Sequence, residues 1–140
     1  MCDAMHLVGE MIGRFAYDRL AIRAVTLGAN PASVTAIAND YSYVDVLLRE
    51  ADALIAPGDA LIGISTSGGA QNITAVARLA RERGAFVVGL TGRSGGILAA
   101  ECDVELRAPS DATPRIQEVH ITLIHALCEA LEARLRPPTA

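Results

Sequence analysis

Residues Ile62–Gly69 read Ile-Gly-Ile-Ser-Thr-Ser-Gly-Gly, and this stretch decides the fold. The apolar run Asp59–Ile64 has the length and composition of a buried strand, and the segment Ala70–Ala80 that follows the turn predicts a helix. Such a turn gathers backbone N–H groups, hydroxyl groups and the positive end of a helix dipole. We therefore expect the turn Ser65–Gly69, called the phosphate cradle below, to bind a phosphate group.

Composition places the sequence among single-domain α/β proteins. Its 140 residues are enough for one domain with a core of its own, and 51% of them are apolar while only 4% are aromatic. A core of Ala, Val, Leu and Ile suits a parallel sheet covered by helices. The net charge of −4 argues against a nucleic-acid partner. All 12 basic residues are arginine, which excludes a Schiff-base or P-loop lysine.

The three cysteines, Cys2, Cys102 and Cys128, are widely spaced and form no C-x-x-C pair. They predict neither a disulfide framework nor a thiolate zinc site, and they favour a cytoplasmic location. No apolar run reaches the length of about 18 residues that a membrane span needs, so we expect no membrane partner.

Strands and helices alternate along the chain with short connections. This pattern predicts an α/β fold with a doubly wound parallel sheet, in which ligands bind at the carboxyl ends of the strands. A second glycine-rich loop, Thr91–Gly96, also follows a strand, and a structural turn is an equally good explanation for it. The expected helices are Cys2–Ala16, Pro31–Asp40, Tyr43–Ala56, Ala70–Ala80, a short one near Ile97–Ala100 and Pro114–Leu135; the expected strands are Ala24–Leu27, Asp59–Ile64, Ala85–Leu90 and Val104–Arg107.

Two helices carry side chains that can do chemistry. His6 and Glu10 are four residues apart on the first helix and share a face. Gln117 and His125 are eight residues apart on the last helix, and we expect them on one face with His120 rotated away. Such a set can bind a divalent metal ion, or it can supply a carboxylate base and an imidazole acid. Taken alone, a solvated helix pair and a core histidine are the commoner explanations.

Five motifs, in this order, resemble those of the phosphoheptose isomerases. These are sugar-isomerase (SIS) domain enzymes that interconvert sedoheptulose 7-phosphate and a glycero-manno-heptose 7-phosphate, and their architecture is flavodoxin-like. The resemblance runs over nearly the whole chain, and the motifs on the two terminal helices are the most specific. The motifs are Cys2–Arg14 with its His6 and Glu10, Ala38–Tyr41, Gly63–Gly68, Leu90–Gly92 and Arg115–His125.

The resemblance implies a role for each matching residue. Glu10 would be the general base that moves a proton between C1 and C2 through an enediol, and His125 would be its acid partner. The resemblance also implies a homotetramer with sites between subunits, and one zinc ion per subunit. The substrate-binding residues would be Glu10, Asn39, Asp40, Ser65, Thr66, Ser67 and Gln117. The zinc ligands would be His6, Glu10, Gln117 and His125.

The sequence departs from the family pattern at three points. The family has helices, a strand and a Gly-Asn-Gly-Gly-Ser loop before the motif that starts here at Cys2. We therefore expect residues 1–140 to form a single SIS domain that is N-terminally incomplete and lacks the first strand. Ala70 stands where many members have a serine, which removes a phosphate donor worth about 1.5–3 kcal/mol. Pro114 stands where some members have an acidic residue.

Two other interpretations remain open. A non-catalytic SIS module that binds a sugar phosphate or a protein partner, such as a replication-initiation factor, fits the loss of a donor at Ala70. A structural α/β fragment, stable only as an oligomer, would have a sheet edge that invites pairing. The apolar side of the last helix is a candidate oligomer interface, although core packing explains it equally well. Its residues are Leu123, Ala126, Leu127, Ala130 and Leu131.

Overall fold

Three parallel strands form the sheet of this chain, of which the computed structural model describes residues 1–135. They are β1 (Ala60–Ser65), β2 (Phe86–Thr91) and β3 (Val104–Arg107), in that spatial order. Ser65 pairs with Thr91, and Thr91 pairs with Arg107, so all three strands end at one edge of the sheet. The strands are largely apolar because both faces of the sheet are covered.

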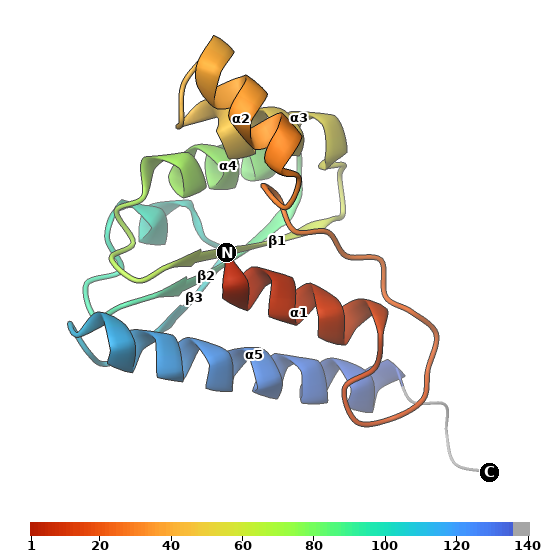
Figure 1. The fold of residues 1–140 in the computed structure, drawn as a ribbon. Helices are drawn as coiled ribbons and strands as arrows, with labels where there is room; N and C mark the ends of the chain where they lie inside the picture. Colours follow the sequence, from red (N-terminus) through yellow and green to blue (C-terminus); the bar gives the residue numbers. More distant parts are fainter. Residues whose placement is uncertain (136–140) are drawn as a thin grey trace.

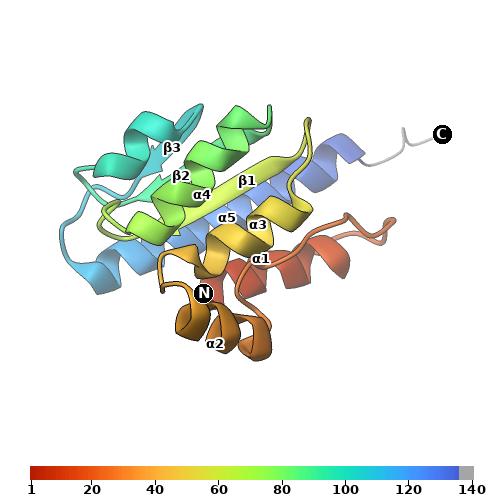
Figure 2. The same ribbon diagram turned by 90° about the horizontal axis from the view of Figure 1, so that it is seen from above.

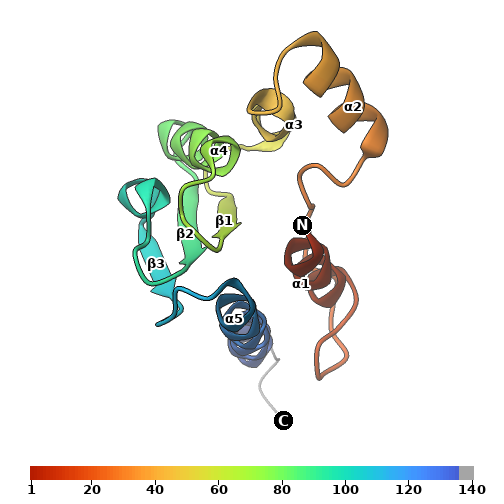
Figure 3. The same ribbon diagram turned by 60° about the vertical axis from the view of Figure 1, so that its left-hand side comes forward.

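Helices cover the two faces unequally. Figure 3 shows α4 and the short helix η1 on one face and α5 on the other, and Figure 2 shows α1, α2 and α3 on the β1 side of the sheet. The helix α1 packs on α5, α3 on α4, and α2 on α3 (Figure 1). The bounds are α1 (Cys2–Ile12), α2 (Pro31–Asp40), α3 (Asp45–Leu54), α4 (Gln71–Glu82), η1 (Ile97–Glu101) and α5 (Thr113–Leu135).

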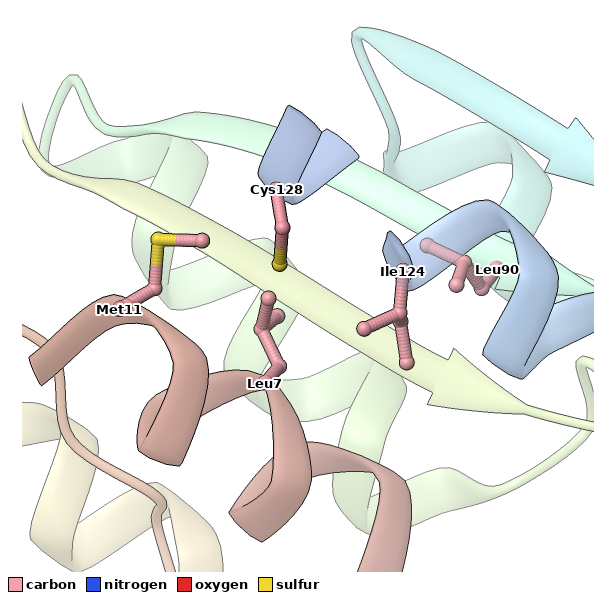
Figure 4. Packing of buried hydrophobic residues seen from close by; sticks show 5 residues of the cluster. All are labelled: Leu7, Met11, Leu90, Ile124 and Cys128. Carbon is pink, nitrogen blue, oxygen red and sulfur yellow. The ribbon is translucent and has the colours of Figure 1, made fainter. Parts of the chain in front are cut away.

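Two apolar clusters hold these layers together. On the α5 face, Leu7 and Met11 of α1 meet Ile124 and Cys128 of α5, and Leu90 of β2 lies beside Ile124 (Figure 4). Complete burial of a leucine or isoleucine side chain stabilises the fold by about 1.5–3 kcal/mol. Small side chains dominate the α4 face, which lets that helix approach the sheet closely. This second cluster consists of Ala77, Ala80, Ala85, Val87 and Leu98.

The structure confirms the predicted α/β class and most of the expected elements, but two expectations are wrong. The segment Ala24–Leu27 is not a strand. It runs along α1, where the N–H group of Ile22 donates to Met11 O (3.0 Å) and Thr26 Oγ1 donates to Ala4 O (3.2 Å). A strand requires a backbone ladder with a neighbour, and residues 1–135 provide none for this segment.

The first helix is shorter than expected. It ends at Ile12, and Gly13 is its C-cap residue, whose N–H group donates to Gly9 O (2.9 Å). The chain then turns back toward the C-terminal half of α5. Among residues 1–135, the structure contains no helix that combines the length and the apolar character of a membrane span.

Candidate functional site

The phosphate cradle lies at the carboxyl end of β1 and leads into α4, as the sequence predicts (Figure 1). The N–H group of Gly68 donates to Ser65 O (3.1 Å), and that of Gly69 donates to Ser67 Oγ (3.1 Å), which closes a tight turn. Ala70 is the N-cap residue of α4, and no side chain caps this helix. The first turn of a helix has N–H groups without a helical partner, and these can bind an anion.

The second glycine-rich loop packs against the backbone of the cradle and supports it. Gly68 has a φ of 64°, and a Cβ atom at this position would collide with the carbonyl oxygen of Gly95. The N–H group of Leu98 donates to Gly68 O (2.9 Å). Because glycines let the two backbones touch, the loop Thr91–Gly96 has a structural role at the cradle, which the sequence left open.

His6, Glu10 and His125 come together between α1 and α5, and we call them the α1–α5 cluster. His6 Nε2 lies 3.3 Å from Glu10 Oε1 and 3.1 Å from His125 Nε2. The ring of Phe15 lies against that of His125, with 5.6 Å between centroids. The side chains of His6 and Glu10 are 43% and 26% exposed, so a small molecule can reach them. A carboxylate beside an imidazole is a base and acid pair suited to proton transfer.

The cluster has donors of the types that zinc binds. Zinc takes imidazole nitrogen and carboxylate oxygen atoms that converge on one point. Here His6 Nε2 lies 3.1 Å from His125 Nε2 and 3.3 Å from Glu10 Oε1, separations that hydrogen-bonded groups and ligands of one tetrahedral ion share. Residues 1–135 contain no group of three or more His, Cys, Asp or Glu residues that could hold a metal ion. The expected zinc ion therefore stays a prediction.

Three of the predicted substrate contacts lie apart from the cluster. Gln117 is exposed near the start of α5. Its separation from His125 is a rise of about 12 Å and a rotation of about 80°, so the two do not share a face as expected. Asn39 and Asp40 are exposed at the end of α2, and Asn39 Nδ2 donates to Asp40 Oδ1 (2.8 Å). Their substrate roles stay predictions.

His120 is a core residue, in agreement with the structural explanation of a lone histidine on an apolar helix. It is fully buried, and its Nε2 lies 3.0 Å from Thr91 O at the end of β2. Because a carbonyl oxygen only accepts, Nε2 donates the proton. Within residues 1–135, Nδ1 has no hydrogen-bond partner. The residue links α5 to the strand beside the cradle.

Sequence reasoning missed Glu132, a buried carboxylate on α5. It is 2% exposed and accepts the N–H groups of residues 15–17 and Arg19 Nε at 2.7–3.1 Å. Burial by itself raises the pKa of Glu132, but the three N–H groups and the guanidinium outweigh it and lower the pKa to about 2. Its only signal in the sequence is a spacing of seven residues from His125, which is close to two helical turns.

Comparisons with known proteins agree with these features. The model of the family described as "SIS domain" matches residues 1–92. The phosphoheptose isomerase of Geotalea daltonii is 46% identical over 133 residues, which cover 95% of this chain and 69% of that protein. The phosphoheptose isomerase of Geobacter sulfurreducens is 45% identical over 135 residues, which cover 96% of this chain and 71% of that protein.

Solved structures give the same result. The phosphoheptose isomerase from Neisseria gonorrhoeae superposes with a TM-score of 0.87 at 41% identity, over 94% of this chain and 70% of that one. The enzyme from Francisella tularensis superposes with a TM-score of 0.86 at 34% identity, over 91% of this chain and 69% of that one.

Proposed function

This chain belongs to the phosphoheptose isomerases of the SIS domain family, and we propose that it interconverts sedoheptulose 7-phosphate and D-glycero-D-manno-heptose 7-phosphate through an enediol, for heptose biosynthesis. The observation that carries the proposal is the contact of Glu10, His6 and His125 between α1 and α5. The phosphate cradle at the carboxyl edge of the sheet supplies the second half of the site.

The cradle binds the phosphate group of the substrate in this proposal. Ser65 is buried at the end of β1, Thr66 is half-buried and Ser67 is exposed, so the three residues differ in their access to solvent. The N–H groups at the start of α4 add donors and a favourable dipole. Phosphate binding here fixes one end of the sugar and leaves C1 and C2 free to meet Glu10.

Glu10 and His125 carry out the proton transfers in this proposal. Glu10 removes a proton from C1 of the ketose while His125 donates one to O2, which gives the enediol. The carboxyl proton of Glu10 exchanges with the solvent, because the side chain is partly exposed, and Glu10 then gives a proton to C2. His125 takes the proton of O1, so that an aldose forms and both residues recover their original states. His6 orients His125, because two ring nitrogens 3.1 Å apart require that one of them carries the shared proton.

The family resemblance adds two further proposals. One is a zinc ion at His6, Glu10, Gln117 and His125, where it would act as a Lewis acid on the sugar oxygens; metal analysis of the purified protein tests it. The other is a homotetramer, and the 40% exposure of Leu131 on the apolar side of α5 supports an interface there. Sedimentation analysis tests that assembly. A cytoplasmic location, with neither nucleic acid nor membrane as a partner, stays a prediction.

The test of the proposed reaction is the conversion of sedoheptulose 7-phosphate by the purified chain. We expect Glu10→Gln and His125→Asn each to lower kcat by about 10²–10⁴-fold, because each removes a group that moves a proton in the transition state. Circular dichroism spectra that match the original protein show that the variants are folded. Equal rates for the original protein and Glu10→Gln, or a folded protein without turnover, would contradict the proposal.

A non-catalytic SIS module is the second candidate. The uncapped start of α4 at Ala70 and the distance of Gln117 from the cluster favour it. Saturable binding of sedoheptulose 7-phosphate, without exchange of its C1 protons with the solvent, would support the module over the enzyme.

A further inference from the structure

We propose that Glu132 and Arg19 act as positioning residues that hold Glu10 in register with His125. The two residues form a clamp between the C-terminal end of α1 and α5. This inference rests on the proposed function, because the geometry that the clamp sets is that of the proposed proton transfer.

The first half of the clamp joins Arg19 to the backbone of the proposed base. Arg19 Nη2 donates to Glu10 O (2.7 Å), and Nη1 donates to Met11 O (2.9 Å). These carbonyl groups lie in the last turn of α1, where no helical N–H group reaches them. The guanidinium is nearly buried and complements the negative end of the helix dipole. Arg19 therefore fixes the turn of α1 that carries Glu10.

The second half joins Arg19 to the helix that carries His125. Glu132 Oε1 accepts Arg19 Nε (2.8 Å) and the N–H group of Phe15 (2.8 Å), and Oε2 accepts the N–H group of Ala16 (2.7 Å). Charge-assisted bonds of this kind are short and directional. Glu132 follows His125 by seven residues, so the two lie within about 20° on α5. One carboxylate thus ties the imidazole-bearing face of α5 to the end of α1.

Apolar packing alone does not set this register. Leu7 and Met11 pack on Ile124 and Cys128 (Figure 4), but the hydrophobic effect has no direction and tolerates small shifts between helices. Proton transfer requires groups held within about 0.5 Å of the productive geometry. A displacement of about 1 Å can lower a rate by about 100-fold. The hydrogen bonds of the clamp are directional, so they fix the register of α1 on α5 that the apolar contact leaves free.

The experiment compares Glu132→Gln with a matched control, Asp59→Asn. Asp59 also joins an arginine, Arg23 (2.8 Å), to a backbone N–H group, that of Ala56 (2.9 Å), but it lies before the amino end of β1. We expect Glu132→Gln to lower kcat by about 10- to 100-fold. Because substrate binding at the cradle is unchanged, KM should stay within about threefold. The control should change neither constant.

A second measurement does not depend on turnover. The rings of His6 and His125 have centroids 5.2 Å apart, so a nuclear Overhauser effect between their protons reports the register of α1 on α5. We expect the same signal intensity in the original protein and in Asp59→Asn, and a weaker signal in Glu132→Gln. An unchanged intensity in folded Glu132→Gln overturns the clamp, whatever the rate. A protein without turnover that shows the expected signals contradicts the proposed function and leaves the clamp supported.

Arg19→Lys serves as the second variant if Glu132→Gln does not fold. It keeps the positive charge but cannot bond Glu10 O, Met11 O and Glu132 together. We expect the same weakening of the histidine signal in a protein whose far-ultraviolet circular dichroism is normal. An unchanged intensity of that signal in Arg19→Lys overturns the proposal in the same way.

Discussion

Gly68 shows how a single residue shapes the cradle. Its φ is positive, and the backbone of the second loop occupies the place of a side chain. A left-handed conformation costs an alanine about 1–2 kcal/mol. We expect Gly68→Ala to destabilise the fold by more than this, because the new Cβ atom would also collide with the second loop. Gly58→Ala is the matched control, because Gly58 has a φ of 85° with nothing within 4 Å of a Cβ atom. Urea denaturation measures both losses, and equal values would contradict the support of the cradle by the second loop.

A substitution at Ala70, in the same turn, should increase both the stability of the protein and its affinity for phosphate. Its backbone is extended (φ −70°, ψ 109°), which suits an N-cap residue, but alanine has no group to cap α4. We expect Ala70→Ser to stabilise the protein by about 0.5–2 kcal/mol and to tighten the binding of inorganic phosphate. Thermal denaturation and calorimetric titration measure the two effects. Unchanged stability together with unchanged phosphate affinity would show that the start of α4 is not part of the site.

Site residues that lie close together in the sequence were predicted better than those whose partners lie far along the chain. The cradle follows from one strand, one turn and one helix, and His6 and Glu10 share a face because they are four residues apart. Glu132 was missed because its partners at residues 15–17 lie more than 100 residues away along the chain. No periodic pattern encodes a contact between a loop after the first helix and the end of the last one.

At the scale of elements, Glu132 predicts how the α1–α5 pair responds to acid. Its pKa is about 2 in the folded chain and 4.5 as an ordinary value, so the folded state favours the carboxylate. The stability that it contributes is complete above about pH 4.5 and is lost as the pH falls toward 2. We expect the free energy of unfolding to fall over this range, and to fall less steeply in Glu132→Gln. Denaturant titrations at several pH values measure this, and parallel slopes for the two proteins would contradict the assignment.

The strand expected at Ala24–Leu27 shows where element prediction fails. Composition indicated a strand, but a strand exists only with a neighbour, and the choice of neighbour is a property of the assembled chain. In the described structure this segment bonds to α1 instead. By contrast, α2 was predicted accurately, because Asn30 caps it through Ala32 N (3.0 Å) and Pro31 begins it.

At the scale of the molecule, the sheet determines which parts of the site meet. Parallel strands bring the cradle and the second loop to one edge, and α5 crosses one face with α1 beside it (Figure 1). The α/β class was predictable because strand and helix alternate along the chain. Residue patterns alone did not predict the contact of His125 with His6, because they set no packing angle between α1 and α5. The family resemblance did place both residues in one site.

The central claim is that Glu10 moves a proton between C1 and C2 of a phosphorylated heptose. The most direct test is to incubate the chain with sedoheptulose 7-phosphate in D₂O and to follow deuterium at C2 of the aldose by NMR. We predict that the original protein introduces deuterium at this carbon and that folded Glu10→Gln does not. Saturable binding of the sugar phosphate by the original protein, with no deuterium at C1 or C2, would contradict the account.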